Sequence, residues 1–476
     1  MHDFLVLIIN ILKRGMFLAI PVMLVCAVIL AVVWIIFKKK KIPFPWKKAL
    51  VLLLLTGWAV LTVYATLFRI EAGFSAWNLH LFAAWREALN KFTLQVWLNV
   101  LLNIALFVPL GVLIPLLFKC FRRWYLALAC GFGTSLVIEI IQLVSGRGMF
   151  DVDDLFTNTL GTMLGFGIVK AVIVTAERGT GWKRQCLCAL SVPVAFSAAM
   201  AAIFLGYSLK PYGNIPDAPI IKANLDGIQW ELEFVPDGTS AKAKVYAAGR
   251  LDKTASEEFA KSFADRVGIE FPDTYYYDDT IIFANHSTGD FLNINQRDGS
   301  WEYKIDTDTA PTFDVNASEI KPAELSGLLA EWGINIPEEA GFSVEPFGED
   351  GKYTATFTSE LVPDSEGLVY GEVICALYEE DGKTLLKSID NRMVSLSPCE
   401  DKTIISQAEA VKELCAGHSF EGTVLERSGV SQVKILSCKL DFMADTKGYY
   451  QPVYRFELLL PEEDDLIFTD YVQALR

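Results

Sequence analysis

Six long apolar runs in the first 207 residues are the feature that most restricts the fold of this chain. Each run is close to the roughly 20 residues that a helix needs to cross the hydrocarbon of a bilayer, so we predict six membrane spans. They cover residues 17–37, 49–68, roughly 96–118, 124–144, 155–175 and 187–207. The first run is too long for a signal peptide, and lysines rather than a small-residue cleavage site follow it. We expect residues 1–16 to form a short interfacial piece.

Charge divides the chain into two parts of different character. Residues 1–207 carry 19 Lys and Arg against 8 Asp and Glu, a net charge of +11. Residues 208–476 carry 23 Lys and Arg against 49 Asp and Glu, a net charge of −26. This asymmetry predicts an α-helical polytopic membrane domain over residues 1–207 and a soluble domain after it.

The positive charges of the membrane half predict its orientation. Six lysines lie in residues 38–48, and three Lys or Arg residues lie in each of 119–123 and 176–186. The alternate loops are poorer in positive charge. Because short cytoplasmic loops are enriched in Lys and Arg, we expect the basic loops to face the cytoplasm of a bacterium. This orientation places both termini and the whole acidic half outside the plasma membrane.

Polar side chains then fall together near the outer ends of three predicted spans. Asn99 and Asn103 are four residues apart and Glu139 and Gln142 are three apart, so each pair shares one helix face. Polar groups at membrane depth are costly and mark a functional site by default. We predict one polar patch beneath a short loop over 145–154. The candidate site residues are Asn103, Glu139, Gln142, Arg147, Asp151, Asp153, Asp154 and Asn158.

Each of these groups also has a purely structural interpretation. Glu139 is either a proton carrier or metal ligand, or a hydrogen-bonded residue that fixes helix packing. Arg147 and the neighbouring aspartates either bind a phosphate-bearing head group with a divalent cation, or form an internal cluster that caps the next helix. We expect Asn103 and Asn158 to join helices rather than bind a ligand.

Several motifs in the membrane half resemble the VanZ-like family of membrane proteins. They are N-L-H-L-F at 78–82, N-I-A-L-F-V-P-L-G-V-L-I-P at 103–115, E-I-I-Q at 139–142, G-R-G-M-F-D-V-D-D at 146–154 and N-T-L-G-T-M-L-G at 158–165. The likeness covers roughly residues 60–175 and departs from the family at Leu81, where we expect proline. It implies a link to glycopeptide resistance of the teicoplanin type, or to cell-envelope biology.

Two further features belong to the helices and their connections. The Gly161 and Gly165 pair has the G-x-x-x-G spacing that lets helices approach closely. Residues 69–95 combine aromatic and polar side chains, and we expect an interfacial helix there. His80 in this segment is a candidate acid–base group, although amphipathic surface is the plainer interpretation.

The acidic half reads as a linker near residues 210–219 followed by an α+β domain. Expected strands are Trp230–Val235, Ala241–Ala247, Thr280–Ala284, Phe291–Asn295, Tyr353–Thr358 and Leu368–Tyr378. Expected helices are Ala255–Arg266, Pro322–Trp332 and Ser406–Cys415. We expect two modules, 208–320 and 321–476. The tail from Thr403 to Ala474 resembles PepSY-like and YycH/YycI-type modules, which implies binding or regulation rather than catalysis.

Cysteine and motif content add little chemistry. Cys375, Cys399, Cys415 and Cys438 allow one or two disulfides in an oxidising compartment, or remain free thiols. The chain contains no G-x-S-x-G, H-E-x-x-H or Walker motif, and we expect neither a cofactor nor a resident metal. The acidic surface argues against nucleic acid as a partner.

These observations favour a non-enzymatic envelope protein. We expect it to bind a membrane lipid, a lipid-linked cell-wall precursor or a glycopeptide at the outer leaflet, while the outer domain senses a signal or docks a protein partner. One alternative is a metal-assisted enzyme in which Glu139, Asp151 and Asp154 act on lipid-linked phosphate. The other is a signalling receptor whose outer domain alone binds ligand.

Overall fold

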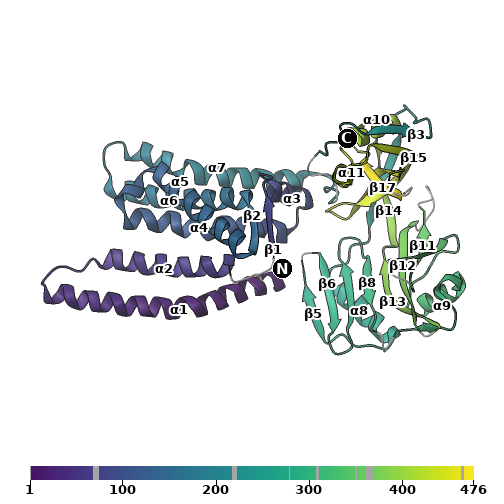
Figure 1. Ribbon diagram of the computed structural model, residues 1–476, viewed down its shortest axis with the longest axis horizontal. Helices are drawn as coiled ribbons and strands as arrows, with labels where there is room; N and C mark the ends of the chain where they lie inside the picture. Colours follow the sequence, from purple (N-terminus) through teal and green to yellow (C-terminus); the bar gives the residue numbers. More distant parts are fainter. Residues whose placement is uncertain are drawn as a thin grey trace. The chain divides into compact units, whose positions relative to one another are not determined.

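The computed structural model describes residues 2–67, 74–216, 222–277, 279–306, 310–348, 351–360, 368–380, 382–462 and 466–475. The chain forms two compact units, a helical unit over Phe4–Lys210 and a second unit built mainly from Pro211–Arg476. Figure 1 shows helices alone as the long elements of the first unit and strands as the main elements of the second. We describe each unit by itself.

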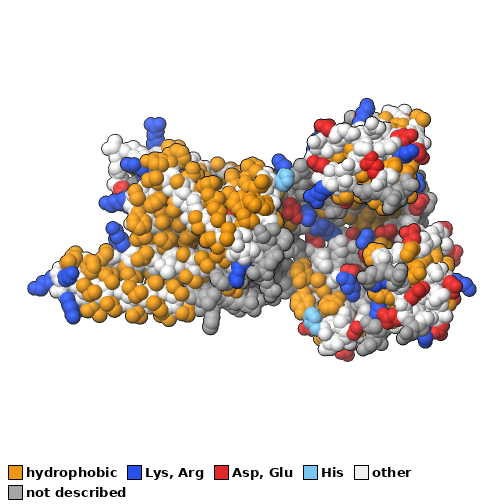
Figure 2. Space-filling view, in the orientation of Figure 1, with side chains coloured by type: hydrophobic (Ala, Val, Ile, Leu, Met, Phe, Trp, Pro, Cys, Tyr) orange, Lys and Arg blue, Asp and Glu red, His pale blue; other side chains and the backbone are white. Residues whose placement is uncertain are grey.

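The expected six membrane spans are confirmed within the described residues. Six helices contain a segment long and apolar enough to cross a membrane, and Figure 2 shows hydrophobic side chains over much of their visible face. They are α1 (His2–Lys39), α2 (Trp46–Leu67), α4 (Leu94–Leu117), α5 (Trp124–Ser145), α6 (Val152–Glu177) and α7 (Trp182–Leu209). The backbone of the expected N-terminal piece is continuous with the first span in α1. The protein is therefore a membrane protein with several spans.

Helices α4 and α6 pack in close contact through glycines. A Cβ atom built on Gly161 would lie 2.0 Å from the carbonyl oxygen of Ile104, and one on Gly165 would lie 2.1 Å from that of Val108. In the other direction, a Cβ atom on Gly111 would lie 1.9 Å from the carbonyl oxygen of Thr162. The prediction of close approach at the G-x-x-x-G spacing is confirmed, because only glycine fits at such a separation.

Two connections of the helical unit differ from expectation. The segment predicted as one interfacial helix contains instead the strand β1 (Phe74–Asn78) and the short helix α3 (Ala83–Lys91), while residues 69–73 lie outside the described residues. The predicted loop contains the strand β2 (Arg147–Asp151), which pairs with β1 in parallel. Pairing gives the backbone N–H and C=O groups of both segments hydrogen-bond partners that a loop would have to find in water. The sequence of either segment alone does not reveal this pairing. A short 3-10 helix, η1 (Lys119–Arg122), joins α4 to α5.

The second unit has the α+β composition expected for it. Its strands are β3 (Gln229–Leu232), β4 (Lys242–Ala248), β5 (Asp273–Tyr276), β6 (Thr280–Asn285), β7 (Asp290–Asn295), β8 (Trp301–Lys304), β9 (Thr312–Phe313), β10 (Gly341–Pro346), β11 (Lys352–Ser359), β12 (Leu368–Glu380), β13 (Lys383–Asn391), β14 (Val394–Thr403), β15 (Gln432–Ala444), β16 (Tyr449–Leu460) and β17 (Leu466–Gln473). Its helices are α8 (Lys253–Val267), η2 (Ala317–Glu319), α9 (Pro322–Glu331), α10 (Gln407–Cys415) and α11 (Gly422–Ser428). All six expected strands and all three expected helices are confirmed to within a few residues.

Strand β12 joins two lobes of this unit. We call the part around β5–β11 and β13 the first lobe, and the part around β3, β4 and β14–β17 the second lobe. Residues Leu368, Val369 and Tyr370 pair with β14 in the second lobe, whereas the rest of the strand pairs with β11 and β13. At the change of partner, Gly371 has φ +115°, and a Cβ atom there would lie 2.3 Å from the carbonyl oxygen of Arg392. Only glycine tolerates both conditions.

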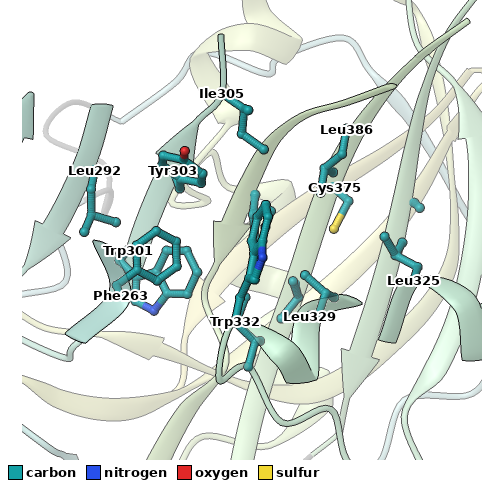
Figure 3. Packing of buried hydrophobic residues seen from close by; sticks show 14 of the residues in the cluster. Phe263, Leu292, Trp301, Tyr303, Ile305, Leu325, Leu329, Trp332, Cys375 and Leu386 are labelled. Carbon is teal, nitrogen blue, oxygen red and sulfur yellow. The ribbon is translucent and has the colours of Figure 1, made fainter. Parts of the chain in front are cut away.

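The first lobe is organised around an aromatic core. Figure 3 shows Phe263 of α8, Trp301 and Tyr303 of β8, and Trp332 after α9 lying together. Phe263 and Trp301 have ring centroids 5.1 Å apart in an edge-on arrangement, which is a favoured geometry for aromatic pairs. The same hydrophobic core also contains residues of the later strands of this lobe, as far along the chain as Ile389 in β13.

The core of the second lobe is built from residues near both ends of the second unit in the sequence. Ala223, Leu225 and Ala243 pack with residues between Ile404 and Ala474. Because the first lobe is inserted between these segments, a boundary at residue 320 does not separate two cores. Sequence alone gives no sign of this insertion, since β4 finds its partners β14 and β16 about 150 to 200 residues later.

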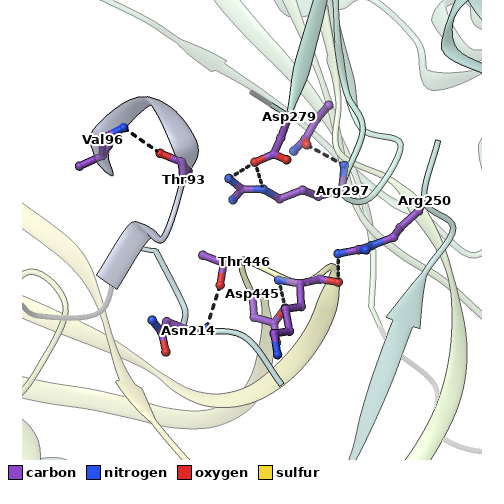
Figure 4. A network of polar contacts seen from close by, with 10 residues as sticks. Thr93, Val96, Asn214, Arg250, Asp279, Arg297, Asp445 and Thr446 are labelled. Carbon is purple, nitrogen blue, oxygen red and sulfur yellow. Dashed lines mark hydrogen bonds and ion pairs between the residues drawn. The ribbon is translucent and has the colours of Figure 1, made fainter. Parts of the chain in front are cut away.

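The chain that follows α7 is tied to the turn between β15 and β16. The backbone nitrogen of Asn214 donates a 2.9 Å hydrogen bond to Oγ1 of Thr446, and Thr446 returns one of 2.8 Å to the carbonyl of Asn214 (Figure 4). The buried carboxylate of Asp445 accepts a 2.6 Å hydrogen bond from the backbone nitrogen of Gly213. Gly213 and Asn214 of the expected linker are therefore held by this turn, while residues 217–219 of the linker lie outside the described residues.

The nine cysteines of the chain are free thiols. Cys375 is buried in the core of the first lobe and Cys438 in that of the second, while Cys399 is exposed. Of the two interpretations that the sequence left open for these residues, the structure agrees with free thiols.

Candidate functional site

The predicted polar patch forms at one end of the helical unit, where β2 leads into α6. Asp151 is both the last residue of β2 and the N-cap of α6, and its Oδ1 accepts a 2.8 Å hydrogen bond from the backbone nitrogen of Asp153. Its Oδ2 accepts a 3.1 Å hydrogen bond from the side chain of Asn78, which stands opposite it in β1. Burial raises the pKa of Asp151, and the nearby charge of Asp153 acts in the same direction.

Glu139 joins the end of α5 to this turn. Its side chain is only 2% exposed, and Oε2 accepts a 2.9 Å hydrogen bond from the backbone nitrogen of Asp151. The charges of Asp151 and Asp154 lie near enough to act on it electrostatically. The carboxylate of Glu139 thus takes the place of water as the acceptor for the backbone N–H of Asp151 at the start of α6.

Asp153 caps a different helix from the one that contains it. The carboxylate accepts hydrogen bonds from the backbone nitrogens of Phe82 and Ala84, the latter at 2.7 Å, at the beginning of α3. Phe82 has φ +66°, a left-handed conformation that is costly for an aromatic residue. A buried carboxylate at the positive end of the helix offsets this cost.

Asp154 connects three spans. Its Oδ1 accepts a 2.7 Å hydrogen bond from the side chain of Asn103 in α4. Its backbone carbonyl accepts a 3.3 Å hydrogen bond from the hydroxyl of Ser135 in α5. That hydroxyl accepts in turn a 2.9 Å hydrogen bond from Asn158 of α6. The two asparagines therefore join helices, as we predicted.

Gln142 and Arg147 reach a fourth span. The side-chain amide of Gln142 donates a 3.1 Å hydrogen bond to the carbonyl of Thr66, and Nη1 of Arg147 donates one of 3.1 Å to the carbonyl of Leu67. Both acceptors lie in the last turn of α2, whose final carbonyls have no partner within the helix. These contacts fasten α2 to α5 and β2.

The structure thus brings together most of the residues predicted from the sequence. Asn103, Glu139, Asp151, Asp153, Asp154 and Asn158 form one connected cluster, which we call the carboxylate cluster. Asn99, which shares a helix face with Asn103, is exposed and makes no side-chain hydrogen bond within the described residues. Sequence reasoning missed Asn78 and Ser135. Ser135 lies four residues before Glu139 on the same helix face, and this spacing was the available signal.

Two acceptor atoms of the cluster remain open. Within the described part of the chain, Oε1 of Glu139 and Oδ2 of Asp154 accept no hydrogen bond, while the other oxygen of each carboxylate does. The described residues hold no group of three or more His, Cys, Asp or Glu side chains arranged to bind a metal ion. The open oxygens can accept hydrogen bonds or pair with a positive charge.

Comparison with known proteins identifies a family for part of the helical unit. The family model described as VanZ/LLP1 matches residues 50–174, from α2 to the last turn of α6, a range that contains the carboxylate cluster. No curated protein matches the chain. Among solved structures, an uncharacterized protein from Eubacterium rectale ATCC 33656 is 13% identical and aligns over 53% of this chain and 91% of its own, with a TM-score of 0.28.

Proposed function

Because residues 50–174 of this chain form a VanZ-like domain, we propose that the protein is a cell-envelope membrane protein that binds an amphiphile at the outer leaflet. The candidate amphiphiles are a membrane lipid, a lipid-linked cell-wall precursor and a glycopeptide of the teicoplanin type. The carboxylate cluster recognises the polar head group of the amphiphile. Binding occurs without a chemical reaction on the head group.

One observation carries this proposal. Glu139 of α5 and Asp154 of α6 each keep one carboxylate oxygen that accepts no hydrogen bond within the described residues. An oxygen that accepts no hydrogen bond can take one from a ligand or pair with its positive charge, so a ligand that supplies donors gains binding energy there. The cluster contains four carboxylates and no Lys or Arg side chain. Amine and hydroxyl groups therefore fit it better than phosphate does.

Our placement of the cluster at the outer leaflet rests on the positive-inside rule. Basic residues lie at the other ends of the helices: Lys38 and Lys39 in the last turn of α1, and Arg122 and Arg123 just before α5. Basic residues at these ends favour the cytoplasm. The cluster and the second unit then belong to the other side of the membrane, where envelope amphiphiles and glycopeptides are met first.

The test compares two variants of the cluster with a matched control. Asp154→Asn and Glu139→Gln remove charge with little change in shape, and Glu177→Gln removes charge at an ion pair with Arg122, where the glutamate is 61% exposed. Cells that contain equal amounts of each protein in the membrane are tested for growth in teicoplanin, and the purified proteins are tested for binding to teicoplanin and to vesicles of an amine-bearing phospholipid. We expect both cluster variants to lose binding and any protection, and the control to retain them. Wild-type behaviour of both cluster variants would contradict the proposal.

A further inference from the structure

The second unit contains a cavity that the proposed function does not use. Its volume is about 540 Å³, and residues of both lobes line it. On the first-lobe side lie Glu372 and Arg392, and on the second-lobe side lie Lys439, Arg455 and Tyr471. Cavities of this size are typical of sites for small molecules.

Three polar side chains of the second lobe form a row across neighbouring strands. Lys439 of β15 is directly opposite Arg455 of β16, and Arg455 is directly opposite Tyr471 of β17. In the next register position, Tyr454 and Val472 are buried in the core of the second lobe. Because side chains alternate between the two faces of a sheet, the row Lys439–Arg455–Tyr471 faces away from that core and toward the cavity.

The row juxtaposes two positive charges that the protein compensates only weakly. Like charges directly opposite in a sheet destabilise it. Arg455 lies 3.8 Å from Asp441 and 3.8 Å from Glu457, at the outer limit of an ion pair, and Lys439 is exposed and makes no ion pair within the described residues. By comparison, Arg392 on the opposite wall contacts Asp390 at 2.6 Å. The guanidinium of Arg392 is therefore engaged by a close carboxylate, whereas that of Arg455 still has N–H donors available for a ligand.

Tyr471 adds a neutral donor to the two cations. Burial raises the pKa of Tyr471, and the charge of Asp441 acts in the same direction, so its hydroxyl keeps its proton. That hydroxyl makes no hydrogen bond within the described residues. An ammonium, a guanidinium and a hydroxyl in one row are the donors that bind a carboxylate or a phosphate. Their placement is unusual in a half of the chain whose net charge is −26.

We propose that the row Lys439–Arg455–Tyr471 binds the anionic group, a carboxylate or a phosphate, of a small polar molecule held in the cavity between the lobes. The anion would lie between the two cations and relieve their repulsion. This inference does not rest on the carboxylate cluster, since no residue is shared between the two sites.

The test uses the purified full-length protein in lipid nanodiscs, with inorganic phosphate and N-acetylglycine as separate probes at matched ionic strength. Calorimetry measures binding, and thermal unfolding without a probe measures the effect of each substitution on folding. The variants are Lys439→Gln, Arg455→Gln and Tyr471→Phe. The control is Lys434→Gln, which removes a lysine of the same strand that pairs with Glu231 at 3.2 Å and does not line the cavity.

We expect saturable binding of at least one probe to the wild type, and the probe that binds more tightly identifies the anionic group. Loss of a charge-assisted hydrogen bond should weaken binding at least about tenfold in Lys439→Gln and Arg455→Gln. Without a probe, Lys439→Gln should unfold at the same temperature as the wild type or higher, because a repulsive neighbour is gone. The inference is overturned if neither probe binds, if Lys434→Gln loses as much affinity, or if Lys439→Gln lowers the unfolding temperature without a probe.

Discussion

The side-chain amide of Asn103 donates a 2.7 Å hydrogen bond to the carboxylate of Asp154, which fixes the relation of α4 to the beginning of α6. Asn103→Ala leaves that carboxylate with one partner fewer, and we expect a loss of about 1.5–3 kcal/mol in the free energy of unfolding. Asn99→Ala is the matched control, because Asn99 is exposed one turn earlier on the same helix. Unfolding in detergent, followed by tryptophan fluorescence, measures both. Equal stability of the two variants would contradict the assignment of this bond.

Alanine at Gly161 should force α4 and α6 apart. The added Cβ would lie 2.0 Å from the carbonyl oxygen of Ile104, and backbone atoms cannot yield as a flexible side chain does. We expect a loss of about 1–3 kcal/mol or more, as for other overpacked contacts. Gly133→Ala provides the control, since a Cβ on this glycine of α5 meets nothing within 4 Å. That variant should be as stable as the wild type or slightly more so, because alanine favours the helix.

Removal of the Asp153 carboxylate should loosen the beginning of α3. Asp153→Ala leaves the backbone nitrogens of Phe82 and Ala84 without their acceptor, which should cost about 0.5–2 kcal/mol, the usual range for a helix cap. Glu87→Ala, in contrast, breaks an ion pair with Lys91 in which both side chains are 42% exposed, and should cost about 0.5 kcal/mol or less. Hydrogen exchange of the α3 amides distinguishes the two. Faster exchange in Glu87→Ala than in Asp153→Ala would refute the capping role.

The thiol of Cys375 makes the stability of the second unit depend on alkaline pH. Burial raises the pKa of Cys375 from its ordinary value of 9.0 to about 12, so the folded chain keeps a proton that the unfolded chain releases. The contribution of this thiol to the free energy of unfolding is therefore fully present below pH 9.0. It is lost as the pH rises toward about 12, by about 1.4 kcal/mol for each pH unit.

Cys375→Ala should remove this part of the pH dependence while it lowers stability at neutral pH by loss of packing. Denaturant unfolding of wild type and variant at about pH 8 and about pH 10 measures the difference, and the tyrosines with raised pKa cancel in the comparison. If the free energy of unfolding falls by the same amount between the two pH values in both proteins, the contribution of this thiol is disproved.

Labelling of two exposed cysteines tests the orientation that we propose. Cys399 lies in β14 of the second unit, and Cys120 lies in η1 between two basic loop residues. In single-cysteine variants, a membrane-impermeant maleimide added to intact cells should react with Cys399 and spare Cys120 until the cells are permeabilised. The reverse pattern would place the second unit in the cytoplasm and contradict the proposed function.

The sequence predicts the local elements of this protein well. The six spans follow from apolar length alone, and strands such as β6 and β7 follow from alternation over a few residues, because both signals are local. The helical spacing of Glu139, and the position of Asp151 before α6, already indicate a polar patch at one end of the unit.

Tertiary contacts decide what the polar residues do, because a hydrogen bond between two distant segments cannot be predicted from the sequence of either segment. Asn99 and Asn103 look equivalent in the sequence, yet only Asn103 meets Asp154. The strand β1 exists because β2 pairs with it 73 residues later, and the first lobe is inserted within the second because β4 pairs with β14. The row Lys439–Arg455–Tyr471 likewise depends on strand register. The sequence by itself therefore determined the spans, the charge division and the position of the carboxylates. Only the folded chain decided which donors they meet, because those donors come from segments far apart in the sequence.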